Sequence, residues 1–128
     1  MAGHAGSGMV ERRRQGQVDV LHVGVAEAWQ ADTIEQLARA LRAAIGASPN
    51  AAFVLDLSAV RFMTSAVLSL LINIRAHLQG RGYGFAVAGA TGDVARMVEH
   101  TRLADVMPVY RTVDEATAAL DPCRDCEE

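Results

Sequence analysis

The chain has 128 residues, of which 51% are hydrophobic and 21% are charged, so it is long enough to bury a core as a single domain. Its net charge of −3 gives no electrostatic basis for binding nucleic acid. No apolar run approaches the length of a membrane span, and the start of the chain lacks an apolar signal-like core, which together favour a cytoplasmic protein.

The chain is expected to begin with a tail and a β-hairpin. Residues 1–8, MAGHAGSG, are mostly small and flexible in composition, which predicts a disordered N-terminal tail. Two strands are expected at 9–14 and 18–23, with a turn between them. Three successive arginines, residues 12–14, could form a basic arm, but the flanking valines favour a solvated edge strand.

A helix and a buried strand follow the hairpin. Residues 31–45 place apolar side chains at helical spacing, and a glycine and a proline follow the last of them. Residues 52–57 are almost continuously apolar, which is typical of a strand covered on both faces. Asp56 could be a catalytic carboxylate at the end of this strand. The surrounding Leu-Asp-Leu-Ser pattern favours a turn or capping residue instead.

A short connection at 59–63 leads to a second long helix at 65–78. Thr64 is expected to cap this helix, because its hydroxyl oxygen can accept a bond from a free N–H of the first turn. Ser65 then falls in the first turn. There, unpaired N–H groups and a partial positive charge would stabilise an added phosphate. The alternative for Ser65 is a serine of the helix start with no chemistry.

The second half of the chain predicts a strand at 83–88, a helix at 93–101, a short strand at 106–109 and a helix at 113–120. Strands alternating with helices indicate an α/β fold with a mixed sheet of four or five strands and helices packed mainly on one face. The side chains expected to be buried in it are Val54, Leu55, Leu68, Leu71, Ile72, Phe85, Val87 and Met97.

Smaller signals refine this second half. Pro108 places the short strand at an edge of the sheet or brings it to an end. Thr112 and Glu115 have the spacing of a capping box for the last helix. The segment 89–92, Gly-Ala-Thr-Gly, precedes a helix and could hold an anion. It lacks the lysine of a nucleotide-binding loop, so a plain strand-to-helix turn is expected.

No catalytic or metal-binding constellation is found along the chain. The four histidines are scattered without metal-ligand spacing. Cys123 and Cys126 form one C-x-x-C pair, which supplies only two ligands and lies in a tail rich in Asp and Glu. We therefore expect a flexible C-terminal tail at 122–128, no metal, no cofactor and no enzymatic activity.

An ordered series of short segments resembles a known family. Its core is Asp56-Leu57-Ser58, then Phe62-Met63, then Thr64-Ser65-Ala66-Val67-Leu68, followed by GFAVAG (84–89), VARMVEHTRL (94–103), MPVY (107–110) and the terminal helix. This series resembles the STAS domain of bacterial anti-sigma-factor antagonists over roughly residues 9–120. The resemblance implies a STAS-type fold at 9–121. The sequence departs from the family pattern at Thr64, where an acidic residue is usual, and at Val67, where glycine is usual.

The resemblance also implies a function. It implies a protein that binds an anti-sigma factor with serine kinase activity and is switched off by phosphorylation of the serine matching Ser65, with Thr64 as the second choice. Transcription would be regulated through the sigma factor that is released. The implied partner-binding residues are Arg61, Phe62, Met63, Thr64, Ser65 and Ala66.

Two other functions are kept as alternatives. The first is a scaffold that does not switch, as a STAS subunit of a stress-signalling or transporter-associated complex, for which self-association is expected. The second is a small enzyme that uses Asp56, Ser65 and a histidine, which requires a pocket that brings the three together. Neither nucleic-acid binding nor membrane insertion is expected.

Overall fold

The computed structural model describes residues 10–24, 27–28, 31–48 and 52–120. The expected tails at 1–8 and 122–128, with Cys123 and Cys126, lie outside the described residues. The elements are β1 (Val10–Gln15), β2 (Val18–Val23), β3 (Glu27–Ala28), α1 (Ala31–Gly46), β4 (Ala52–Asp56), β5 (Phe62–Met63), α2 (Ser65–Gly80), β6 (Gly84–Ala88), α3 (Gly92–His100), the 3-10 helix η2 (Leu103–Asp105), β7 (Val109–Tyr110) and α4 (Val113–Leu120).

The main sheet has five strands in the order β1-β2-β4-β6-β7, which confirms the mixed sheet predicted from the sequence. β1 and β2 pair antiparallel, whereas β2, β4, β6 and β7 run parallel to one another. The hairpin turns at Gly16, whose φ of 66° is a conformation that glycine adopts without steric cost. β3 and β5 form a separate two-stranded parallel sheet.

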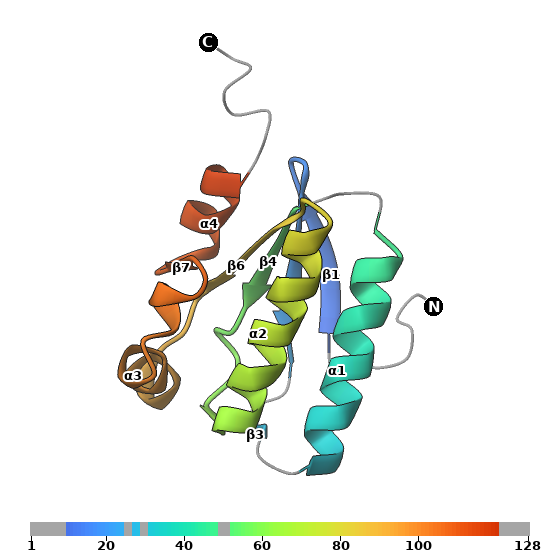
Figure 1. Cartoon of the computed structure of the whole chain (residues 1–128). Helices are drawn as coiled ribbons and strands as arrows, with labels where there is room; N and C mark the ends of the chain where they lie inside the picture. Colours follow the sequence, from blue (N-terminus) through green and yellow to red (C-terminus); the bar gives the residue numbers. More distant parts are fainter. Residues whose placement is uncertain (1–9, 25–26, 29–30, 49–51, 121–128) are drawn as a thin grey trace.

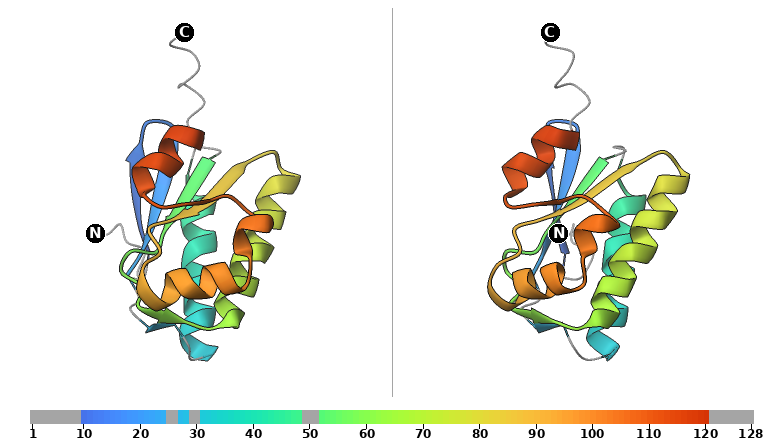
Figure 2. Two further views of the ribbon diagram at one scale, coloured as in Figure 1. Left: turned by 90° about the vertical axis from the view of Figure 1, so that its left-hand side faces the viewer. Right: turned by 60° about the vertical axis from the view of Figure 1, so that its left-hand side comes forward.

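Helices cover the two faces of the sheet unequally (Figure 2). α1 and α2 lie side by side on one face, as Figure 1 shows, and α4 lies on the other. Strand residues alternate between the faces, so the larger side chains Phe53, Leu55 and Phe85 pack beneath α1 and α2. On the opposite face smaller residues, such as Val54 and Ala86, pack against Ala116 of α4. Helices therefore lie mainly on one face, as predicted.

Most of the side chains expected to be buried are buried, but two predictions were wrong. Ile72 is 37% exposed, because α2 packs through Leu71 and Ile74 and residue 72 is turned away from the sheet. Met97 is only partly buried, since α3 directs Val94 and Val98 inward and Met97 lies at the flank. The confirmed buried residues are Val54, Leu55, Leu68, Leu71, Phe85 and Val87.

The edges of the sheet match the sequence pattern, with one shift in register. β1 is an edge strand, and its arginines 12–14 are exposed, as predicted. The last strand begins at Val109 instead of residue 106. Pro108 has no N–H to donate, and Val106 is already used as the C-cap of η2. Thr112 Oγ1 accepts the N–H of Glu115 at 3.1 Å, which confirms the threonine half of the predicted capping box.

Candidate functional site

The candidate site lies at the end of the sheet where β4 and β6 finish and their chains turn into α2 and α3 (Figure 1). Both strands are central and parallel, so their carboxyl ends meet at one edge. Two strand-to-helix connections therefore lie next to each other. Such edges of parallel sheets are where binding residues commonly gather.

Ser65 is the first residue of α2 and its side chain is exposed, as the sequence predicted. Thr64 is the N-cap residue, with an extended backbone (φ −104°, ψ 174°), but its side chain makes no capping hydrogen bond. The predicted hydroxyl cap is therefore wrong in its chemistry although it is right in its position. The first turn closes through its backbone, with the Val67 N–H donating to the Thr64 carbonyl at 3.0 Å.

The start of α2 is electropositive, because no carboxylate offsets its unpaired N–H groups. The first turn of α2 contains no acidic residue. A helix start carries about half a positive elementary charge from its unpaired N–H groups. An anion attached to Ser65 would therefore lie at the favourable end of the helix dipole.

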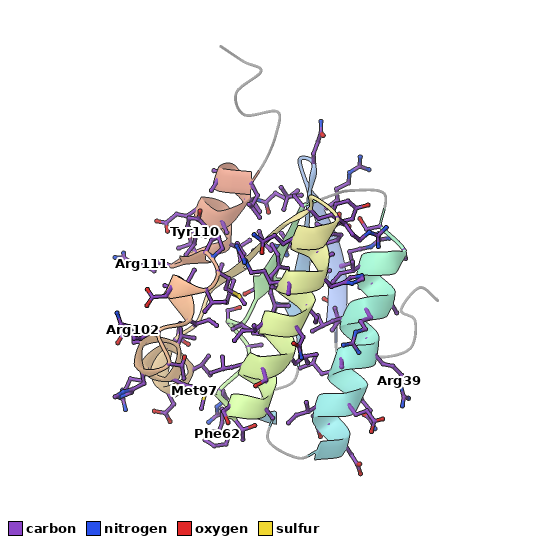
Figure 3. The ribbon with its side chains drawn as sticks, viewed as in Figure 1. Arg39, Phe62, Met97, Arg102, Tyr110 and Arg111 are labelled. Carbon is purple, nitrogen blue, oxygen red and sulfur yellow. The ribbon has the colours of Figure 1, made fainter. Side chains whose placement is uncertain are left out.

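The loop before α2 exposes an aromatic side chain. Phe62 is 45% exposed, although large apolar side chains are usually covered. Figure 3 shows it beside the first turns of α2, at one end of the molecule. Its neighbour Arg61 is also exposed, and β5 is held in place by pairing with β3, Phe62 opposite Glu27. The side chain of Met63 lies outside what the structure describes.

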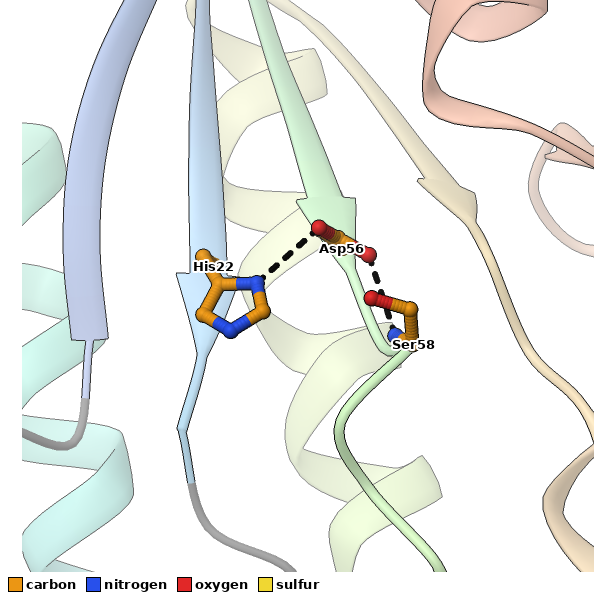
Figure 4. A network of polar contacts seen from close by, with 3 residues as sticks. All are labelled: His22, Asp56 and Ser58. Carbon is orange, nitrogen blue, oxygen red and sulfur yellow. Dashed lines mark hydrogen bonds and ion pairs between the residues drawn. The ribbon is translucent and has the colours of Figure 1, made fainter.

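Asp56 is a buried turn residue that also holds a histidine (Figure 4). Its Oδ1 accepts the backbone N–H of Ser58 at 3.0 Å, as expected of a turn aspartate. Its Oδ2 lies 3.0 Å from Nδ1 of His22, which is opposite it in the β2–β4 register. The sequence reasoning missed this pair, because the contact depends on β2 lying beside β4.

The same contacts set the protonation of Asp56. Burial works to raise the pKa of its carboxyl, but the hydrogen bonds from His22 and Ser58 outweigh burial and lower the pKa below its ordinary value. Asp56 is therefore held as a carboxylate. Its bonds tie β4 to β2 on one side and to the connection that leads to α2 on the other.

Gly89 joins the second connection to this carboxylate. Its φ is +82°, and a Cβ added there would lie 2.8 Å from Asp56 Oδ1 and 3.3 Å from the Ser58 nitrogen. Only glycine fits at such a distance. Gly89 thus packs against the start of the β4–α2 connection, and the segment 89–92 leads into α3, as expected for a strand-to-helix turn.

The three groups of the enzyme alternative are not joined into one unit. Asp56 is paired with His22, whereas Ser65 shares no hydrogen bond with either in the part of the chain that is described. Within the same residues, no group of three or more His, Cys, Asp or Glu side chains is placed to hold a metal ion. No described helix is both long enough and apolar enough to cross a bilayer.

Comparison with known proteins places this geometry in a family. An anti-sigma factor antagonist from Mycobacterium paratuberculosis has a similar structure, with a TM-score of 0.71 and 31% identity over 87% of this chain and 92% of its own. The Bacillus cell fate determinant SpoIIAA in its phosphorylated form matches with a TM-score of 0.60 and 14% identity, over 86% of this chain and 97% of its own. No curated protein matches the chain in sequence.

The fold also occurs as part of a much larger protein. The murine anion transporter Slc26a9 matches with a TM-score of 0.70 and 15% identity, over 84% of this chain but only 18% of the transporter. The STAS domain family model matches residues 12–116, which is most of the sequence. The chain therefore belongs to the STAS domain family, and its structural neighbours include anti-sigma factor antagonists.

Proposed function

We propose that this protein is an anti-sigma-factor antagonist that binds an anti-sigma factor with serine kinase activity and is switched off by phosphorylation of Ser65. The observation that carries the proposal is the placement of Ser65, which is exposed as the first residue of α2 in a STAS fold. The similarity to an anti-sigma factor antagonist at 31% identity supports the choice of partner class.

The proposed binding surface is the loop before α2 and the first turn of the helix, residues 61–66. Phe62 supplies an aromatic side chain that is already exposed, and such residues are common anchors of protein interfaces. The surface continues along α2, where the exposed residues Ser69, Ile72 and Asn73 are uncharged. Removing water from an uncharged surface costs less free energy than removing it from a charged one. The exposure of Ile72, which was expected in the core, therefore supports a role of this surface in binding a partner.

Phosphorylation of Ser65 would act differently on the fold and on the interface. The phosphate brings a charge of about −1.5 to −2, which the start of α2 accepts because its first turn holds no carboxylate. A partner seated over the same residues would have to desolvate that charge without a matching cation. We expect binding to weaken about tenfold to a hundredfold, the range of typical coupling energies.

The switch would connect this surface to transcription. In the unphosphorylated state the protein occupies the anti-sigma factor, and the sigma factor is released. In the phosphorylated state the anti-sigma factor returns to the sigma factor. Thr64 is the second-choice acceptor; it is less exposed than Ser65, which favours Ser65. This proposal places the protein in the cytoplasm, with its partner.

A scaffold that does not switch is the second candidate, and the Slc26a9 match is the observation that favours it. In this case the fold would serve as a module in a larger assembly, and Ser65 would be an ordinary residue of the helix start. The scaffold candidate predicts that charge at Ser65 has no effect on partner binding. It also predicts self-association or assembly that is independent of phosphorylation.

The test is capture of the partner from native lysate with four forms of the protein: wild type, Ser65→Ala, Ser65→Glu and Ala119→Glu. Ala119 is exposed on α4, which packs on the opposite face of the sheet from α2, so Ala119→Glu controls for added charge away from the proposed surface. We expect Ser65→Ala and Ala119→Glu to retain an anti-sigma factor and Ser65→Glu to lose it. Mass spectrometry then identifies the partner and the phosphorylated residue.

A further inference from the structure

A second candidate site lies at the opposite end of α2 from Ser65. A cleft of about 310 Å³ opens between the last turns of α1 and α2, with Gly46 in its lining. Ser65 and Arg81 are sixteen positions apart, about 24 Å along the helix axis. The cleft therefore lies beyond Ser65 and the loop before α2 and shares Asn73 with the far end of the proposed partner surface. Its size is at the lower end of small-molecule sites.

The floor of the cleft is apolar. Ile74 and Leu78 of α2 are 5% and 1% exposed, and Ile45 of α1 packs against the same core. Ile74 and Leu78 are almost fully covered by the protein itself, whereas Ile45 is only partly buried and supplies accessible apolar surface that a short apolar ligand body could cover. Burial of such a body would contribute about 25 cal/mol for each Å² removed from water.

The rim of the cleft is cationic and without counter-charge. Arg42, His77 and Arg81 line it, and neither arginine forms an ion pair within the described residues. Four described arginines have carboxylate partners, as Arg39 has in Glu35 at 3.4 Å; the other described arginines form no ion pair in the part of the chain that the structure describes, and two of these, Arg42 and Arg81, line the same cleft. The Arg81 guanidinium instead lies 5.1 Å from the centroid of the Tyr83 ring. Two guanidinium groups that lack a carboxylate partner among the described residues thus line a partly apolar cleft.

The helix ends explain only part of this arrangement. Cations near a helix C-terminus are favoured because they complement its carbonyl groups. This applies to Arg81, the C-cap residue of α2. It does not apply to Arg42, because the last turn of α1 contains no basic residue and Arg42 lies before it. Arg42 therefore adds a positive charge to the cleft that the helix ends do not require.

We propose that this cleft binds a small amphipathic anion, consisting of one carboxylate or phosphate head on a short apolar body. The head would be held by Arg42 and Arg81, whose planar guanidinium groups suit both carboxylate and phosphate. The body would lie over Ile45, Ile74 and Leu78. This activity goes beyond the proposed switching at Ser65 and does not depend on it.

The test is titration of the ¹⁵N-labelled full-length protein by NMR, following the amide signals of residues 42, 77 and 81. Octanoate and octyl phosphate carry both parts of the proposed ligand, octan-1-ol carries the body alone, and inorganic phosphate carries the head alone. We expect saturable shifts with octanoate or octyl phosphate, and at least tenfold weaker binding of octan-1-ol and of inorganic phosphate. The comparison of the two amphipathic anions decides between a carboxylate and a phosphate head.

Substitutions then locate the head group. Arg42→Gln and Arg81→Gln should each weaken binding of the preferred anion about tenfold. Arg39→Gln should leave it unchanged, because Arg39 lies one turn earlier on α1 and is paired with Glu35. Equal affinity of Arg42→Gln, Arg81→Gln and wild type would overturn the proposal. So would equal affinity for octan-1-ol and octanoate, or no saturable shift with either amphipathic anion.

One further outcome would identify a different occupant. Residues 121–128 carry Asp121, Asp125, Glu127 and Glu128, and they directly follow Leu120, the last described residue. If deletion of 121–128 moves the amide signals of the cleft and neither anion binds, the cleft receives the acidic tail and the ligand proposal fails. Ser65→Glu should retain anion binding, so failure here and failure of the proposed switch are distinguishable.

Discussion

Helices α2 and α3 begin in nearly the same way, and the difference between them is informative. Each belongs to a connection that leaves a central parallel strand, with the short β5 lying between β4 and α2. Each also has a threonine N-cap, Thr64 or Thr91, with an extended backbone and no side-chain capping bond. The first turn of α3 contains Asp93, whose carboxylate lies 3.4 Å from Arg96. The first turn of α2 contains no acidic residue and starts with the exposed Ser65.

The comparison separates a complete helix start from an incomplete one. Asp93 already supplies the negative charge that the start of α3 favours. At α2 the same charge is missing, and a hydroxyl that can accept a phosphate stands in the first turn. A phosphate on Ser65 would supply at the start of α2 the negative charge that Asp93 supplies at the start of α3. We therefore expect phosphorylation of Ser65 to leave the stability of the fold unchanged or slightly raised, and to lower the affinity for a partner that binds this surface.

The largest stability effect is expected where the two connections touch. Gly89→Ala places a Cβ 2.8 Å from Asp56 Oδ1 on a backbone with φ +82°, so both the connection to α2 and the connection to α3 must shift. We expect the free energy of unfolding to fall by about 2–4 kcal/mol, measured by urea denaturation. Gly80→Ala is the control, because nothing lies within 4 Å of a Cβ there. A loss below about 1 kcal/mol for Gly89→Ala would mean that the two connections are not rigidly packed.

Removal of the Asp56 carboxylate should have the next largest effect. Asp56→Ala leaves the Ser58 N–H and the His22 ring without their partner in a site where the Asp56 side chain is only 10% exposed. The expected destabilisation is about 1–3 kcal/mol, measured by urea denaturation at pH 7. Asp105→Ala is the matched control, since its side chain is 65% exposed and its one ion pair among the described residues is with Arg102. Equal effects of the two substitutions would contradict the importance of the network.

The pH dependence of stability should report the same carboxylate. The pKa of Asp56 is lower in the folded state than in the unfolded state. The ionised carboxylate therefore contributes fully to the free energy of unfolding above the unfolded pKa of about 4, and this contribution is lost as the pH falls through the folded pKa. The stability difference between wild type and Asp56→Asn should therefore shrink as the pH is lowered from 6 toward 2. Thermal melting across this range measures it. A difference that stays constant down to pH 2 would show that the charge of Asp56 does not contribute.

The smallest effects compare the two helix starts directly. Ser65→Asp should stabilise the fold by about 0.3–1 kcal/mol, and Asp93→Asn should destabilise it by a similar amount, because one adds and the other removes charge at a helix start. Ser65→Asn is the uncharged control for the first change. Both effects should diminish in high salt. Destabilisation by Ser65→Asp would mean that the start of α2 does not favour an anion.

Local patterns were sufficient to predict much of this fold. The hairpin, the continuously apolar β4 and the start of α2 at Ser65 follow from turn residues and from the spacing of apolar side chains. Ile72 was misjudged because apolar character alone does not say which side of a helix meets the sheet. Thr64 has the backbone of an N-cap, but a side-chain rotamer is not a property of the sequence.

Other features depend on contacts between distant segments. The His22–Asp56 pair arises because β2 and β4 are neighbours, an arrangement that no local pattern specifies. The cleft between α1 and α2 likewise depends on Arg42 and Arg81, which are far apart in the sequence, lining the same space. The family resemblance supplied the functional interpretation of Ser65, and the structure added the exposed Phe62 and the uncharged face of α2 beside it.

The most direct test of the central claim is the affinity of the captured partner for the protein in two states, unphosphorylated and phosphorylated at Ser65, measured by isothermal titration calorimetry. We predict binding that is about tenfold to a hundredfold weaker in the phosphorylated state, while its melting temperature is unchanged or slightly higher. Equal affinity of the two states would contradict the claim that Ser65 is a switch and would favour the scaffold.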